Sequence, residues 1–180
     1  MFKLSATALL ASVIASGALA QGNYFESGNW AVVRMGKTCQ MFTLRADRHT
    51  SGMLSFRFDE QGYNAGFSYE YYPWSNDEGA PWDQSSDYVE LYVDDAAVWL
   101  GDEMFLGTHM GRDGASMTSG FVGEMIDALS KAKNNISVAV HISAKGETWT
   151  YGGFSTDGFT AVAQQAGAMC EFNPSALPAS

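Results

Sequence analysis

The chain has only two cysteines, Cys39 and Cys170, and they lie near opposite ends of its globular part. A disulfide between them would close almost the whole domain into one loop, which constrains the fold more than any other feature. In the chain-entropy model such a loop contributes at most roughly 5 kcal/mol of stability. The alternatives are a reactive pair or a metal-binding pair, but neither cysteine belongs to a C-x-x-C arrangement.

The first 20 residues have the pattern of a secretory signal peptide. Lys3 supplies a positive charge, an apolar run follows at 9–14, and Ala18-Leu19-Ala20 offers the small residues that a signal peptidase needs. The run is too short to span a membrane, and Gln21 stands where a lipid-anchored protein would have cysteine. We therefore expect a periplasmic or secreted protein without a membrane anchor, folded where a disulfide forms.

Composition and charge limit the class of protein. Hydrophobic residues make up 46% of the chain and aromatic residues 13%, so the bulk of it is expected to fold. We expect one domain over 21–172 and a flexible tail over 173–180. The net charge of −10 opposes binding to nucleic acid and to anionic membrane surfaces.

Alternating apolar residues predict a fold built mainly from antiparallel strands. The clearest case is 53–58, where Leu54, Phe56 and Phe58 share one face and Ser55 and Arg57 the other. Asp94-Asp95 is expected to form a tight turn, and three strands between 88 and 110 a meander. Further strands are expected at 30–33, 39–44, 66–72, 88–93, 96–100, 104–110, 136–142 and 148–151.

Two segments have the apolar period of a helix. Ser119 is expected to cap the first, which ends near residue 133, and Asp157 the second, whose apolar side includes Cys170. The segments 21–28 and 111–120 are expected to be irregular. The sequence therefore predicts a β-rich α+β fold, an antiparallel sheet or sandwich with two packed helices and one disulfide.

A long loop at 73–86 carries two tryptophans among prolines, glycines and acidic residues. Loops of this length are uncommon unless they have a function, and aromatic side chains with polar atoms favour binding surfaces. We take Trp74 and Trp82, with Tyr72 and Tyr88 beside them, as the candidate binding surface. The alternative is that both tryptophans fold back and close one open end of the sheet.

Signatures of catalysis or metal binding are weak. The three histidines, His49, His109 and His141, have no H-x-H or H-E-x-x-H spacing. Ser116 lacks the final glycine of a G-x-S-x-G nucleophile elbow. Acidic residues cluster at 77–87 and 94–103 without the spacing of a calcium loop. We expect no cofactor and no metal, and the sequence designates no catalytic residue.

The C-terminal half resembles a known family. Its helix, strand and hairpin, followed by Gly158-Phe159-Thr160-Ala161 at the start of a helix, resemble exported proteins of the invasion-associated locus B family. The early strand Trp30-Ala31-Val32-Val33, with a cysteine soon after it, resembles them too. The resemblance implies a small, sheet-rich exported domain with no established enzymatic activity and a link to host-cell invasion. It carries no functional residue over to this chain.

These observations favour an exported, non-catalytic binding or accessory domain of the bacterial periplasm or cell exterior. The partner is a protein, a peptide or a glycan, and the resemblance adds an association with virulence. The alternative is a small exported hydrolase acting on cell-envelope glycans or peptides, which would use unidentified carboxylates or His109 and His141. The sequence does not predict an oligomeric state.

Overall fold

The computed structural model describes residues 22–45, 51–73, 79–100, 103–109, 111–117 and 119–178. The expected signal peptide at 1–20 lies outside these ranges. No helix in the described ranges is long and apolar enough to cross a membrane.

The strands form two antiparallel sheets. The seven-stranded sheet has the order β1-β2-β3-β4-β5-β9-β8, and the four-stranded sheet has the order β11-β10-β6-β7. The first contains β1 (Tyr24–Ser27), β2 (Trp30–Met35), β3 (Thr38–Arg45), β4 (Gly52–Asp59), β5 (Gly66–Tyr71), β8 (Met104–His109) and β9 (Arg112–Met117). The second contains β6 (Tyr88–Val93), β7 (Ala96–Leu100), β10 (Asn135–Ile142) and β11 (Glu147–Ser155).

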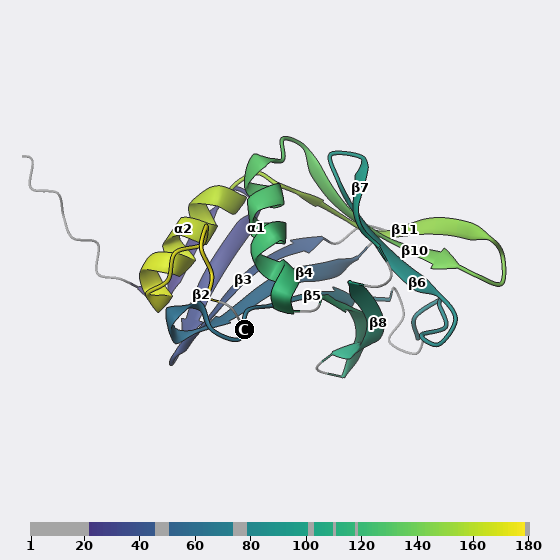
Figure 1. Ribbon diagram of the computed structural model, residues 1–180, viewed down its shortest axis with the longest axis horizontal. Coiled ribbons are helices and arrows are strands. Elements are labelled where there is room, and N and C mark those ends of the chain that lie inside the picture. The colour runs from purple at the N-terminus through teal and green to yellow at the C-terminus, as the bar shows by residue number, and fades with distance from the viewer. Residues whose placement is uncertain are drawn as a thin grey trace, which may run out of the picture.

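Two helices complete the domain, α1 (Val122–Lys131) and α2 (Phe159–Cys170), with short 3-10 turns at Glu60–Gly62 and Ser119–Phe121. Helix α2 lies against β1, β2 and β3, β11 crosses β3 and β4, and β6 approaches β8. Both helices and the smaller sheet therefore cover the same face of the larger sheet, as Figure 1 shows. The predicted β-rich fold with two packed helices is confirmed.

An aromatic cluster forms the centre of the core where the sheet meets α2. The ring of Phe56 on β4 lies 5.1 Å from Phe67 and 5.7 Å from Phe159. Trp30 meets Phe159 edge-on at 4.9 Å, and its indole N–H donates to the carbonyl of Ser155 at 2.8 Å. The hydrogen bond satisfies the indole of Trp30 inside the core.

The predicted disulfide between Cys39 and Cys170 is confirmed, and it joins the C-terminal end of α2 to β3. Arg34 on the neighbouring strand β2 reinforces this junction. Its guanidinium donates to the carbonyl of Met169 at 2.6 Å, which satisfies one of the free carbonyls at the end of the helix.

Two segments that we expected to be irregular are strands. The lead-in at 21–28 contains β1, which pairs with β2 along the sheet edge. The segment 111–120 contains β9, whose Gly114 approaches β5 so closely that a Cβ would lie 1.8 Å from the carbonyl oxygen of Tyr69. Glycine usually indicates a loop, but here the strand pairing requires it.

Four further expectations need correction. The strands between 88 and 110 form no meander, because β6 and β7 pair in one sheet and β8 belongs to the other. Neither helix has a side-chain cap, so Ser119 and Asp157 do not act as expected. The tail does not hang free over its described part, because Leu177 packs against the core.

The Asp94-Asp95 turn is confirmed and has a second role. Both residues adopt left-handed backbone angles, with φ of 50° and 67°. The Asp94 carboxylate accepts the backbone N–H groups of Lys133 and Asn134, each at 2.8 Å, and that of Asn135 at 3.3 Å. These hydrogen bonds lower the pKa of Asp94 below its ordinary value. The turn therefore fixes the segment between α1 and β10.

We predict that loss of the disulfide destabilises the protein by about 2–5 kcal/mol, because the unfolded chain then gains the freedom of an open loop. The measurement is urea unfolding of the Cys39→Ala/Cys170→Ala double variant against the oxidised protein. The oxidised protein treated with a reductant serves as the control and should lose a similar amount. An unchanged midpoint would contradict the anchoring role of the bridge.

We predict that Asp94→Asn lowers the melting temperature at neutral pH, because it removes the charge and replaces one of the two oxygens that accept these N–H groups with a donor. The folded-state pKa of Asp94 is depressed, so its stabilising effect is present above the unfolded pKa and is lost as the pH falls through the folded pKa. The difference from the wild type should therefore shrink below about pH 4. Asp95→Asn is the matched control, since Asp95 accepts no hydrogen bond in the described ranges. Equal melting curves for both variants at pH 7 would refute this role.

Candidate binding surfaces

The structure places Trp82 in the core. Its side chain is 8% exposed and packs edge-on against Tyr71 and Tyr151, each at 5.1 Å. Trp82 therefore closes one end of the space between the two sheets, which is the alternative raised from the sequence. Trp74 lies outside the described residues.

The indole N–H of Trp82 is buried without a hydrogen-bond partner in the described structure. The nearby hydroxyl of Tyr69 is satisfied, because it donates to the carbonyl of Tyr151 at 3.0 Å. Burial raises the pKa of both Tyr69 and Tyr151, so their rings stay neutral in this part of the core.

Acidic side chains fasten the loop around Trp82. The Asp87 carboxylate accepts the backbone N–H groups of Asp83 and Ser143, each at 2.8 Å, and these bonds lower its pKa. Asp113 accepts the N–H of Ala80 at 3.1 Å and the amide of Gln84 at 3.0 Å. These carboxylates stabilise turns, which is the ordinary role of such residues.

One face of the seven-stranded sheet is covered by no described helix or strand, and several large apolar side chains are exposed on it. Strand alternation and register place four large apolar residues on it, each more than half exposed: Tyr24, Met35, Leu44 and Phe105. Val33, Phe42 and Met53 lie on the same side and are partly exposed. We call these seven residues the apolar face. An exposed apolar surface of this kind is a candidate interaction site.

A row of small residues crosses the middle of this face. The row consists of Ser55, Ser68 and Ser116, which lie side by side on β4, β5 and β9. Phe42 on β3 and Phe105 on β8 stand at its two ends. The hydroxyls of Ser55 and Ser68 lie 2.9 Å apart and satisfy one another. The two phenylalanines thus stand at the ends of a row of three serines, of which Ser55 and Ser68 hydrogen-bond one another.

Tyr72 lies at one end of the apolar face. The guanidinium of Arg112 sits 4.7 Å from the centre of its ring, and its hydroxyl donates to Glu70 at 3.4 Å. Partial burial is the main cause of the raised pKa of Tyr72. At the other end, Arg57, Gln40 and neighbouring residues border a cleft of about 300 Å³.

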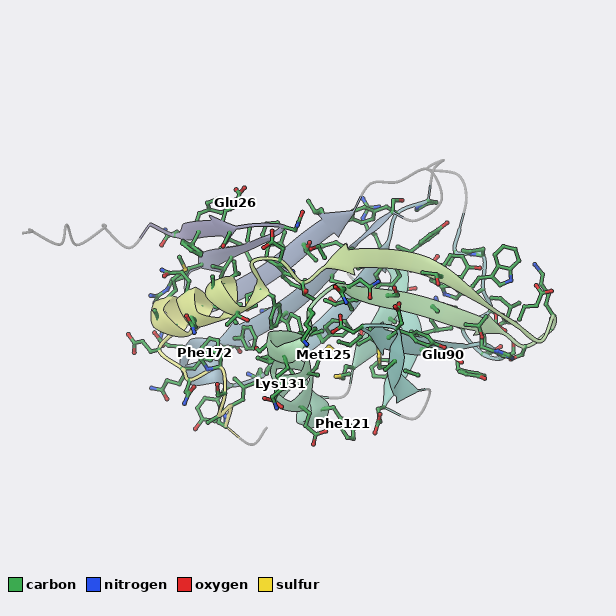
Figure 2. All side chains as sticks on the ribbon, turned by 90° about the horizontal axis from the view of Figure 1, so that it is seen from above. Glu26, Glu90, Phe121, Met125, Lys131 and Phe172 are labelled. Atoms are coloured by element: carbon green, nitrogen blue, oxygen red, sulfur yellow. A yellow bond between two sulfur atoms is a disulfide. The ribbon has the colours of Figure 1, made fainter. Side chains whose placement is uncertain are left out.

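The outer face of the four-stranded sheet is polar. Its β6 side chains include Tyr88, which stacks on His141 at 4.7 Å, and Tyr92, whose hydroxyl donates to Glu90. This hydrogen bond raises the pKa of Tyr92. The ring of His141 also bonds Thr148 at 3.1 Å. Figure 2 views the molecule from above and labels Glu90 on this sheet.

A cleft of about 410 Å³ lies over β10 and β11 on the same outer face. Neutral polar side chains line it over the backbone of Gly153: Asn134, Asn135, Ser137, Thr150 and Ser155. Ser137 pairs directly with Tyr92 across β10 and β6, so an aromatic ring stands beside this cleft. We call it the β10–β11 cleft.

A hydrolase would need carboxylates or histidines close to one another, and the described part of the chain contains no such cluster. No three His, Cys, Asp or Glu side chains there could hold a metal ion. The buried carboxylates of Glu70 and Glu90 lie on the outer faces of opposite sheets. His49 and the side chain of His109 lie outside the described part, while His141 is stacked on Tyr88.

Tyr72 and Tyr88 from the predicted surface thus lie on two different faces, and Trp82 lies in the core. The apolar face was missed, although the sequence contains a signal for it. In the segment Met41-Phe42-Thr43-Leu44 apolar residues occupy both alternating sets of positions, which indicates a strand with two apolar faces. The β10–β11 cleft has no comparable signal, because its residues are ordinary polar ones.

No family model matches the chain, and it has no significant match to a curated protein or to a solved structure. The resemblance to the invasion-associated locus B family therefore stays a prediction.

We predict that Trp82→Ala destabilises the protein by about 3–5 kcal/mol, because it removes a large buried side chain and leaves a cavity between Tyr71 and Tyr151. Trp149→Ala is the matched control, since Trp149 is 52% exposed on the β10–β11 hairpin. Urea unfolding should separate the two variants clearly. Equal midpoints would show that Trp82 is not a core residue.

Proposed function

We propose that this protein is an exported, non-catalytic accessory domain that docks onto a protein partner through the apolar face. The observation that supports the proposal most is that Tyr24, Met35, Leu44 and Phe105 are all exposed on the same side of one sheet. Such patches in exported domains are typical of protein–protein contacts.

The shape of the apolar face suits a partner side chain. Phe42 and Phe105 stand at the two ends of the row through Ser55, Ser68 and Ser116. Because the side chains between them are small, an apolar group can approach there, and the hydroxyls of Ser55 and Ser68 keep one another as hydrogen-bond partners. Aromatic residues at its borders supply the anchors that dominate most interfaces.

Charge defines the partner further. The chain carries a net charge of −10, so long-range attraction favours a partner whose docking surface is apolar at its centre and basic around it. Raising the salt concentration should slow association with such a partner more than it speeds dissociation.

Export and the link to virulence belong to the same proposal. The Cys39–Cys170 disulfide is compatible with an oxidising compartment, and the signal-like segment at 1–20 supports export. The hydrolase alternative has no observation in its favour among the described residues.

The proposal predicts site-specific crosslinking in cells that produce the protein. A photoreactive p-benzoylphenylalanine at position 44 or 105 should give the same discrete adduct with a second protein. The same group in place of Trp149, which is equally exposed on the other sheet, should not give that adduct. Adding Leu44→Glu to the variant labelled at Phe105 should abolish it, because a charge enters the apolar contact.

Three results would contradict the proposal. In the first, neither position on the apolar face gives an adduct. In the second, position 149 gives the same adduct as positions 44 and 105. In the third, the adduct has the mass of two copies of this chain. Melting curves of each labelled variant show whether the fold is intact.

A further inference from the structure

The β10–β11 cleft has the size of a small-molecule site. Its volume of about 410 Å³ lies within the range of ordinary ligand pockets, about 300–1,000 Å³. It lies on the four-stranded sheet, on the side of the molecule away from the apolar face. A function for this cleft is therefore separate from the docking function proposed above.

Hydrogen-bonding groups in the cleft are unused. The side chains of Asn134, Asn135, Ser137 and Thr150 make no hydrogen bond within the described part of the chain. Two amides and two hydroxyls provide both donors and acceptors toward one space. A ligand with closely spaced hydroxyl groups, each of them donor and acceptor, matches this set.

The cleft is also held in place before any ligand arrives. The carboxylate of Asp94 fixes the backbone of Asn134 and Asn135. At the other wall, the carbonyl of Ser155 accepts from Trp30 at 2.8 Å. Rigid walls reduce the ordering cost of binding.

Charge narrows the ligand class. None of the side chains that line the cleft is charged, so it has no counter-charge for an anionic or a cationic group. The acidic chain as a whole repels anions. The lining thus offers no ion pair to a charged ligand, and a neutral ligand fits it.

An aromatic residue, Tyr92, lies next to the cleft, outside its lining. Tyr92 stands beside Ser137, and its hydroxyl is tied to Glu90, so the ring is fixed in orientation. The apolar C–H face of a sugar ring packs on such a surface, while its hydroxyls meet the amides and hydroxyls of the cleft. We propose that the β10–β11 cleft binds a neutral saccharide.

Calorimetric titration tests this proposal with four neutral tetrasaccharides: cellotetraose, chitotetraose, maltotetraose and mannotetraose. At least one should bind the wild-type protein. The Ser137→Ala/Thr150→Val double variant should lose about tenfold or more in affinity, because it removes two hydrogen-bonding groups.

Thr148→Val is the matched control, since Thr148 lies on the same strand and the same face as Thr150 but outside the cleft lining. This control should bind like the wild type. The Leu44→Glu/Phe105→Glu variant should also bind normally, so a failure of the docking proposal and a failure of this one are distinguishable.

The proposal is overturned if no neutral tetrasaccharide binds the wild type, or if the double variant binds as well as the wild type. It is also overturned if tetra-alanine or tetragalacturonate binds this cleft more tightly than every neutral sugar. Matching melting temperatures show that the variants are folded.

Discussion

The attachment of α2 to the N-terminal strands is the constraint on which the rest of the structure depends. At its C-terminal end the helix is held by the Cys39–Cys170 bridge and by Arg34. At its N-terminal end Gly158 approaches the chain so closely that a Cβ would lie 1.8 Å from the carbonyl oxygen of Ser27. Fixed at both ends, α2 places Phe159 against Trp30 and completes the central aromatic cluster.

Because the helices and the smaller sheet cover one face of the larger sheet, the outer sides of the two sheets form two surfaces of different chemistry. Because α2, α1 and the smaller sheet share one side of the larger sheet, the other side of that sheet keeps its apolar residues in contact with solvent. The outer side of the smaller sheet instead presents neutral amides, hydroxyls and tyrosines. The two proposed binding sites thus lie on surfaces of different chemistry.

Local patterns predicted the elements whose stability is local. The alternation at 53–58, the Asp94-Asp95 turn and the hairpin after Ile136 all appear in the structure. The disulfide was also predictable, because only one pairing of two cysteines exists. Local sequence preferences predicted irregular segments at β1 and β9, but pairing with neighbouring strands makes both of them strands. At β9, Gly114 is needed for the close contact with β5.

The candidate site was less predictable than the fold. Whether Trp82 is exposed depends on how the loop returns between the sheets, and no local pattern encodes that path. The side chains of the β10–β11 cleft come from two strands and a connecting segment, so only the pairing of β10 with β11 brings them together. These asparagine, serine and threonine residues are of types common on any protein surface, so nothing in the sequence distinguishes them.

The position of α2 after all the strands has a consequence for how the protein folds. Synthesis runs from the N-terminus, so β2, β3 and β4 emerge long before the helix that covers them. During that interval Trp30, Phe56 and Phe58 have no partner layer, and Cys39 has no thiol to pair with. The core therefore closes only after α2 has been made, because its aromatic centre and its disulfide both need residues of that helix.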